Sequence, residues 1–218
     1  MAATIRRRGT VHVAILGAGR LGGTLAELLG RHGHEVSVAA RRPAAELAAR
    51  VEGWPNVTAV DRPQLVGADV VVLAFPWRDA QTALAGLDLA GHVVADATNP
   101  FSADFEVLDT GTEGATGTIS RLLPGARVVK AFNTLPAELY DEAARGTVAS
   151  AERVGIPVAA DDVDAADEVA DLLGDLGFTA VNVGGLAAGR DLMEPASPLF
   201  NVPLPARELE QRVAQLRG

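Results

Sequence analysis

The sequence predicts an α/β protein built on a doubly wound, parallel sheet with a small C-terminal α/β extension. Three observations favour this fold class. Apolar runs of strand length alternate with helical patterns along the chain. The first strand, residues 11–16, leads through a glycine-rich turn into an amphipathic helix. Finally, 4% of the residues are aromatic and 48% are hydrophobic, as suits a parallel sheet covered by helices.

The elements follow in a regular order along the chain. The apolar runs predict strands at residues 11–16, 35–40, 57–60, 69–75, 92–95, 127–132, 156–160 and 178–183. The first helix runs from the glycine turn to Gly33, and later patterns predict helices at 43–51, 62–66, 78–84, 119–123, 136–144, 165–173 and 207–216. The remaining long stretches are expected to be a polar loop over 102–118 and a tail over 186–201.

The turn after the first strand predicts a dinucleotide site. It reads Gly17-Ala18-Gly19-Arg20-Leu21-Gly22, a GxGxxG between a strand and a helix. Gly17 allows the sharp turn, Gly19 lets a diphosphate approach the backbone, and Gly22 lets the helix pack closely on the strand. The helix N-terminus then offers free N–H groups to the phosphates. The alternative is a glycine turn with a purely structural role.

The end of the second strand indicates which dinucleotide is bound. Sites for NAD usually have an acidic residue there, whereas this chain has Arg41 and Arg42. Guanidinium groups bind phosphate well, so we expect NADP(H), with both arginines at the 2′-phosphate. The alternative is a pair of solvated arginines. Arg20 is equally compatible with a phosphate contact and with a solvated side chain.

Ligands in such sheets bind at the carboxyl ends of the strands. The residues that follow the fourth, fifth and sixth strands are therefore candidates, and they are Phe75, Pro76, Trp77, Thr98, Asn99, Pro100, Asn133 and Thr134. Three of them offer flat apolar surface for a ring, and the amides and hydroxyls offer hydrogen bonds. The alternatives are a rim of core residues and loop capping.

Acid–base residues are scarce at that edge. The four histidines, His12, His32, His34 and His92, lie at the amino ends of strands or in the turns before them. Asp96 and Lys130 are either functional or structural partners of neighbouring strands. A nicotinamide site without an evident general acid or base suits hydride transfer to another redox cofactor, where the protein aligns two rings. We therefore assign no catalytic acid or base.

Composition excludes several other classes. The net charge of −9 argues against nucleic acid as a partner. The chain has no cysteine, which removes disulfides, thiolate nucleophiles and cysteine-ligated metals, and we expect no metal site. No signal peptide or membrane-spanning run is evident, and Arg6-Arg7-Arg8 is interpreted as part of a short mobile tail. A soluble cytoplasmic protein is expected.

Several motifs in order resemble a known family. They are GAGRLGGTLAELLGRHGHEVSVAARR, VVVLAFPW, VVADATNPF, PGARVVKAFNT, GGLAAGRDLMEP and PLFN. Together they resemble the NADPH-dependent coenzyme F420 reductase (F420:NADP oxidoreductase) family, and the KAFNT motif also resembles the reductase domain of the mammalian metalloreductases. The resemblance covers about residues 11–201.

The resemblance implies a role for each matching position. The NADP site would comprise Gly17, Ala18, Gly19, Arg20, Leu21, Gly22, Arg41 and Arg42, with Ala74, Phe75, Pro76 and Trp77 near the nicotinamide. The deazaflavin ring of F420 would lie near Asn99, Pro100, Asn133, Thr134, Leu135 and Pro136. Residues 1–145 would form the NADP-binding Rossmann domain. Residues 146–218 would contribute to the acceptor site and form a homodimer.

Three other functions remain open at this stage. Flavin, and through it ferric iron, could replace F420 as the acceptor, although this sequence shows no membrane domain to hold a haem. Reduction of an imine or oxidation of a 3-hydroxy acid ranks low, because those relatives carry a long helical C-terminal domain. A module that senses NADPH without turnover belongs to a different class. It predicts tight NADPH binding and no oxidation by any acceptor.

Overall fold

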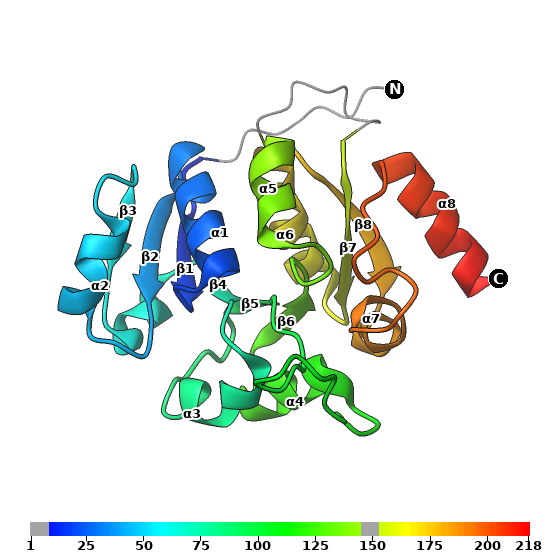
Figure 1. Cartoon of the computed structure of the whole chain (residues 1–218), viewed down its shortest axis with the longest axis horizontal. Helices are drawn as coiled ribbons and strands as arrows, with labels where there is room; N and C mark the ends of the chain where they lie inside the picture. Colours follow the sequence, from blue (N-terminus) through cyan, green and yellow to red (C-terminus); the bar gives the residue numbers. More distant parts are fainter. Residues whose placement is uncertain (1–8, 145–152) are drawn as a thin grey trace.

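A computed structural model describes residues 9–144 and 153–218, and within them the predicted α/β fold class is confirmed. Eight described strands form one sheet in the order β3-β2-β1-β4-β5-β6-β7-β8 (Figure 1). The strands are β1 (His12–Leu16), β2 (Glu35–Ala39), β3 (Val57–Ala59), β4 (Val70–Leu73), β5 (Val93–Asp96), β6 (Arg127–Lys130), β7 (Gly155–Ala160) and β8 (Thr179–Gly184). The predicted tail at Arg6-Arg7-Arg8 and the boundary between residues 145 and 146 lie outside the described residues.

The helices connect these strands in the expected alternation. They are α1 (Arg20–Arg31), α2 (Ala44–Val51), α3 (Ala80–Leu84), α4 (Gly114–Leu122), α5 (Ala137–Ala144), α6 (Val163–Asp175), α7 (Leu186–Met193) and α8 (Ala206–Arg217), with short 3-10 helices η1 (Arg62–Gly67) and η2 (Trp77–Asp79). None of the helices within the described ranges is long and apolar enough to cross a membrane.

The strands β1 to β6 are parallel, and β1 lies between β2 and β4. The expectation of a wholly parallel sheet is wrong at one place, because β7 pairs with β6 in the antiparallel sense. The strand β8 then runs parallel to β7, so the C-terminal strands extend the same sheet. An apolar run has the same pattern in either direction, which is why the sequence did not show this reversal.

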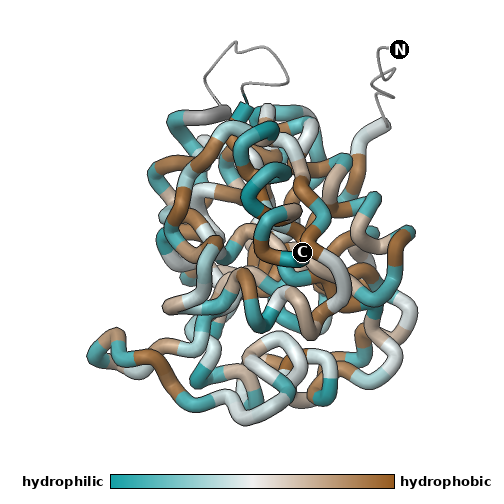
Figure 2. Tube along the Cα trace, turned by 90° about the vertical axis from the view of Figure 1, so that its right-hand side faces the viewer, coloured by the Kyte–Doolittle hydropathy of each residue, from teal (hydrophilic) through white to brown (hydrophobic). Residues whose placement is uncertain are grey.

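Helices cover both faces of the sheet, so the sheet is the middle one of three layers. Val13 and Ile15 of β1 pack in the core cluster that includes residues of α1, α5 and α6. Ala14 and Leu16, which point to the other face, pack in the cluster with η1, α3 and α4. A third cluster joins α7 and α8 to β7 and β8. Figure 2 looks onto the C-terminal helix α8, whose outward turns are mostly hydrophilic.

The helix α4 begins earlier than predicted, and α7 occurs where the sequence predicted irregular structure. The helix α4 overlaps the predicted helix 119–123 but begins at Gly114, inside the predicted loop 102–118, and α7 occupies the first half of the predicted tail 186–201. Both contain glycine, which lowers intrinsic helix propensity. Tertiary contacts compensate: a Cβ at Gly189 of α7 would meet Ala159 of β7 at 2.7 Å. These two helices form part of the site described below.

Candidate functional site

The glycine turn lies at the carboxyl ends of three neighbouring strands. The N–H of Gly17 donates to the carbonyl of Ala39 at the end of β2, over 2.8 Å. A Cβ on Gly17, whose φ is +123°, would overlap the Ala74 carbonyl after β4. Gly22 packs so closely against Gly17 that a Cβ there would overlap its carbonyl. The predicted roles of Gly17 in turning and Gly22 in packing therefore have a clear steric basis.

Gly19 differs from both, because it faces open space. Nothing lies within 4 Å of a Cβ built at this position, and Gly19 itself is exposed. It is the N-cap residue of α1, where no side chain caps the helix and no acidic residue occupies the first turn. The N–H groups of the first turn thus carry a positive partial charge beside an open backbone. This geometry fits the diphosphate of a dinucleotide.

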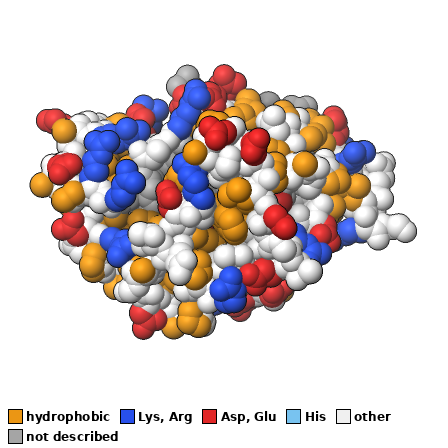
Figure 3. Space-filling view, turned by 60° about the horizontal axis from the view of Figure 1, so that its bottom comes forward, with side chains coloured by type: hydrophobic (Ala, Val, Ile, Leu, Met, Phe, Trp, Pro, Cys, Tyr) orange, Lys and Arg blue, Asp and Glu red, His pale blue; other side chains and the backbone are white. Residues whose placement is uncertain are grey.

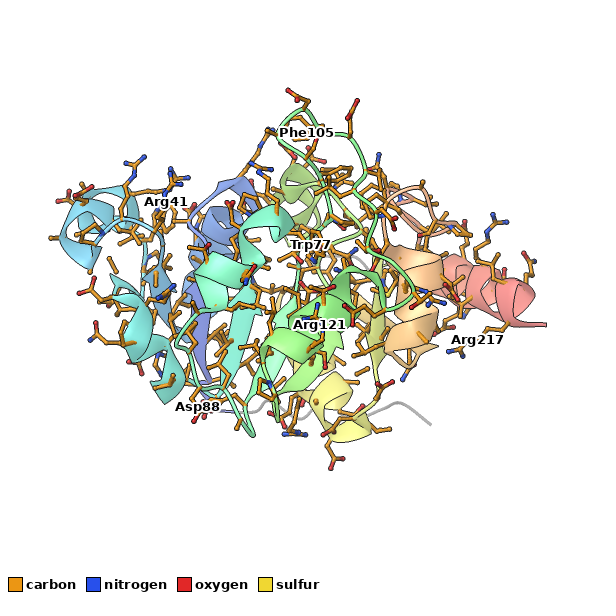
Figure 4. All side chains as sticks on the ribbon, turned by 90° about the horizontal axis from the view of Figure 1, so that it is seen from below. Arg41, Trp77, Asp88, Phe105, Arg121 and Arg217 are labelled. Atoms are coloured by element: carbon orange, nitrogen blue, oxygen red, sulfur yellow. The ribbon has the colours of Figure 1, made fainter. Side chains whose placement is uncertain are left out.

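Basic side chains lie beside the turn. Figure 3 shows arginine side chains gathered on one side of the face that is turned toward the viewer, with hydrophobic side chains across its middle. Arg41 lies on the corresponding side in Figure 4, well away from Trp77. Arg41 and Arg42 follow β2 after one intervening residue, Ala40, and are exposed, and none of the described acidic residues forms an ion pair with either. Their guanidinium groups are available to an anion.

Arg20 has a different environment from the arginine pair. Its guanidinium forms an ion pair with Glu138 in the first turn of α5, and both side chains are substantially exposed. Arg20 therefore links the glycine turn to the segment that follows β6. An exposed pair of this kind contributes little to stability, so it can exchange for another anion at low cost.

An aromatic residue stands at the centre of the same edge. Trp77 begins the short helix η2 after β4 and is half-buried, as is Phe75, whereas Pro76 is exposed. The indole Nε1–H of Trp77 donates to the carbonyl of Ala115 in α4, over 2.9 Å. Figure 4 shows Trp77 near the middle of the molecule, between Arg41 and the C-terminal elements. The indole orientation is thus fixed by the first turn of α4, which lies within the loop that the sequence predicted over residues 102–118.

The structure brings Asn99 and Asn133 into direct contact. Nδ2 of Asn99 donates to the backbone carbonyl of Asn133 over 2.8 Å, and Nδ2 of Asn133 donates to Oδ1 of Asn99 over 3.1 Å. Asn133 also donates to the carbonyl of Met193, at the end of α7, over 2.8 Å. The neighbouring Thr134 is buried, and its carbonyl accepts the N–H of Asn201. Pro100 is buried beside them.

A buried ionic network lies beneath these amides. Asp96 and Lys130 face each other on β5 and β6, both are 0% exposed, and Lys130 Nζ lies 3.1 Å from Asp96 Oδ2. Lys130 also donates to the Thr98 carbonyl over 2.5 Å, and Asp96 accepts the hydroxyls of Thr98 and Thr116. Every charged group in this network is therefore paired, which is what burial requires. Both residues serve each other as structural partners, one of the two alternatives above.

Glu194 is the residue that the sequence reasoning missed. It follows α7, is 7% exposed, and its Oε1 accepts the N–H of Ala115 in the first turn of α4 over 2.7 Å. Burial raises the pKa of the Glu194 carboxyl, while the Lys130 ammonium and the N–H of Ala115 oppose that rise. One signal in the sequence could have indicated it, because Glu194 stands in the GGLAAGRDLMEP motif. Its partner, however, is 79 residues away.

Backbone strain concentrates in the same region. Five non-glycine residues of the described chain have positive φ angles, and four of them follow β5, β6 or α7: Phe105, Phe132, Ala196 and Asn201. Such conformations cost about 1–3 kcal/mol each and cluster at functional sites. Phe105 is also 81% exposed and lies on a loop that projects from the molecule (Figure 4). The segments that follow β5, β6 and α7 are therefore the more strained part of this edge.

The histidines occupy the other edge, as predicted. His12 begins β1 and contacts Ser37, His34 precedes β2 beside Asp175, and His92 precedes β5 beside the Val66 carbonyl. Burial lowers the pKa of His34, an effect that the Asp175 carboxylate opposes. None of these three rings is near the amides that follow β5 and β6, so the described histidines offer no proton donor there.

The chain is similar to one known protein family and to several solved structures. Residues 12–100 match the profile of the family described as NADP oxidoreductase, coenzyme F420-dependent. A hypothetical protein from Sinorhizobium meliloti is similar in structure, with 31% sequence identity and a TM-score of 0.78 over 90% of this chain and 96% of that one. A candidate F420-dependent NADP reductase from an Arthrobacter species is 29% identical, with a TM-score of 0.70 over 82% and 86% of the two chains.

More distant structures share the fold alone. A reductive aminase from Aspergillus terreus, solved with NADPH and ethyl levulinate, is 18% identical with a TM-score of 0.59. The alignment covers 84% of this chain but 57% of the aminase, which continues beyond the shared fold. No functionally curated protein matches this sequence.

Proposed function

The chain belongs to the family of coenzyme F420-dependent NADP oxidoreductases, and on that basis we propose that it transfers a hydride between NADP(H) and coenzyme F420. It is an NADP-dependent oxidoreductase, and the identity of the acceptor is the part that we propose. The observation that carries the proposal is the composition of the carboxyl edge. Two interlocked amides, Asn99 and Asn133, lie there beside a half-buried Trp77, and the charged residues beneath them are paired with each other.

The residues of the edge divide into four subsites. We propose that Gly17, Ala18, Gly19, Leu21 and Gly22 hold the diphosphate, with Arg20 released from Glu138 to contact it. Arg41 and Arg42 hold the 2′-phosphate, because both are exposed and follow β2. Ala74, Phe75, Pro76 and Trp77 border the nicotinamide. Asn99, Pro100, Asn133 and Thr134 border the acceptor ring.

The protein's contribution to catalysis is alignment. The reduced nicotinamide supplies the hydride when it is bound, and the deazaflavin ring accepts it. Asn99 and Asn133 fix each other's orientation, and Trp77 is held by α4, so the groups around the two rings are positioned in advance. Holding two reactants in a near-attack geometry can supply about 7–11 kcal/mol of the barrier. The deazaflavin ring also takes up one proton with the hydride, and solvent can supply it, so the mechanism requires no side chain to donate or accept a proton.

We propose separate roles for the N-terminal and C-terminal portions of the chain. Residues 1–145 form the NADP-binding domain, and residues 146–218 form an extension that completes the acceptor side and mediates a homodimer. The hydrogen bonds from Asn133 to Met193 and from Asn201 to Thr134 support the first of these roles.

An acceptor screen tests the function directly. The purified protein is mixed with NADPH and offered F420, FMN, FAD or riboflavin, while the nicotinamide absorbance is followed. Oxidation with F420 alone is the expected result. Oxidation with flavins alone would replace the proposal with a flavin or ferric reductase. Tight NADPH binding without oxidation by any acceptor would indicate a sensing module.

A further inference from the structure

The N-terminus of α4 is capped by a residue from the far end of the chain. Its N-cap residue, Glu113, makes no capping hydrogen bond, and the first turn of α4 contains no acidic residue. The carboxylate of Glu194 takes that role by accepting the N–H of Ala115 over 2.7 Å. A negative charge at a helix N-terminus meets the positive end of the helix dipole, which offsets part of the cost of burying the Glu194 carboxylate. Glu194 therefore fixes the position of the first turn of α4.

The first turn of α4 also fixes the indole of Trp77. The residue that donates to Glu194, Ala115, also accepts the Nε1–H of Trp77 through its carbonyl. Indole nitrogen has one hydrogen and no acceptor, so this bond satisfies its hydrogen-bonding capacity. A shift of Ala115 would therefore leave the indole N–H without a partner or rotate the ring. Trp77 belongs to the group that we place beside the nicotinamide.

The residue before Glu194 fixes the amides on the acceptor side. The Met193 carbonyl accepts one hydrogen of Asn133 Nδ2, and Oδ1 of Asn99 accepts from the same nitrogen. An amide nitrogen has two hydrogens, so both are used and the orientation of the Asn133 side chain is determined. The anchor at Glu194 thus holds the adjoining carbonyl that orients Asn133.

From these contacts we propose that Glu194 is a positioning residue, which holds Trp77 and Asn133 in a fixed relation to each other through Ala115 and the Met193 carbonyl. This rests on the proposed function, which assigns those two side chains to opposite sides of the hydride transfer. The charged groups around Glu194 are consistent with an anchor. Lys130 and Asp96 pair with each other, and Arg190 forms an ion pair with Asp191.

Substitution of Glu194 tests the proposal with two independent readouts. The variants Glu194→Ala and Glu194→Gln are made in a Trp54→Phe background, because Trp54 and Trp77 are the two tryptophans of the chain. Trp77 emission then reports on the indole environment, and steady-state kinetics give KM for the acceptor and kcat separately. Glu113→Gln is the matched control, because Glu113 adjoins the same helix end and pairs with Arg121 at the surface.

We expect Glu194→Ala to move the Trp77 emission toward that of a solvated indole. It should also reduce kcat/KM for the acceptor by about tenfold or more, since small displacements of positioning groups are costly. The Kd for NADPH should change less than about threefold, which corresponds to a free-energy difference below about 1 kcal/mol. The reason is that the proposed phosphate contacts are distant from Glu194. Glu194→Gln should restore much of both signals, because its amide oxygen can accept the N–H of Ala115.

Two results would overturn the proposal. One is a folded Glu194→Ala variant with unchanged Trp77 emission and unchanged acceptor kinetics. The other is an equal effect from Glu113→Gln. If Glu194→Ala does not fold, Glu194→Gln and the shorter Glu194→Asp are compared, and a graded loss across that pair is expected. If none of the offered acceptors allows the unmodified protein to oxidise NADPH, the proposed function fails. The emission of Trp77 still tests the positioning role in that case.

Discussion

The proposed phosphate side and the proposed acceptor side of this edge are built in opposite ways. The phosphate side consists of backbone and exposed side chains from one continuous stretch, which runs from β1 through the glycine turn to Arg42. The acceptor side consists of buried side chains from the ends of β5 and β6, from α4 and from the segment after α7. Its polar groups bond chiefly to each other.

This difference indicates at which positions the fold tolerates substitution. Exposed charges such as Arg41 can be altered with little effect on folding, because surface charges contribute little to stability. A buried polar network has no such freedom, since removal of one partner leaves the other unsatisfied. Ligand affinity and fold stability should therefore be separable at the exposed positions of the phosphate side and coupled on the acceptor side.

The largest expected effect comes from the glycine turn. Gly17→Ala should lose both stable folding and NADPH binding, because its φ is strongly positive and its Cβ would overlap the Ala74 carbonyl. Gly19→Ala is the matched control, with a φ of −74° and open space around the Cβ. We expect this variant to melt close to the unmodified protein and to bind NADPH weakly. Thermal unfolding and calorimetric titration measure the two properties, and normal NADPH binding by Gly19→Ala would place the diphosphate elsewhere.

The second largest effect should come from the buried ion pair. Lys130→Met removes the cation that faces Asp96 and leaves a fully buried carboxylate without its charge partner. The free energy of unfolding should fall by about 3–5 kcal/mol, as measured by urea denaturation. The double variant that adds Asp96→Asn should recover part of the loss, since it removes the unpaired charge. A fall of the same size in the double variant would contradict the electrostatic explanation.

An intermediate effect is expected for the arginine pair. Replacing Arg41 and Arg42 by Ala should weaken NADPH binding by about 1.5–3 kcal/mol per lost charge-assisted hydrogen bond. NADH binding and the melting temperature should stay nearly unchanged, because NADH lacks the phosphate and both side chains are exposed. Calorimetry with the two dinucleotides gives the comparison, and Arg31→Ala, which breaks an exposed pair with Glu27 on α1, is the control. Equal losses for NADPH and NADH would refute the 2′-phosphate assignment.

The smallest effect concerns Glu194 and pH. Burial raises the pKa of this carboxyl above 4.5 in the folded protein. A raised pKa means that its contribution to stability is complete below the unfolded value and is lost as the pH rises through the folded value. Glu194→Gln cannot ionise, so its melting temperature relative to the unmodified protein should increase as pH rises from about 4.5. Melting curves over that range measure the difference, and a constant difference would show that Glu194 does not titrate with folding.

Local patterns were sufficient for much of the phosphate side. The strand–turn–helix from Val11 to Gly33 lies where the sequence predicted it, and Gly17 and Gly22 are sterically required there. The chain also indicated that Asn99 and Asn133 follow adjacent strands. The bonds between their side chains, and the third bond to Met193, depend on the distance between segments that are remote in sequence. No periodicity encodes that distance.

By itself, the sequence determined the fold class, the alternation of elements and the edge at which a dinucleotide would bind, because these depend on hydrophobic period and glycine conformation, which are local properties. The tertiary structure alone decided the reversed direction of β7, the extension of α4 into the expected loop 102–118, the presence of α7 in the expected tail 186–201, and the contact between Glu194 and Ala115. Their physical reason is shared: each is stabilised by partners far along the chain, whose identity is defined only after the sheet has assembled.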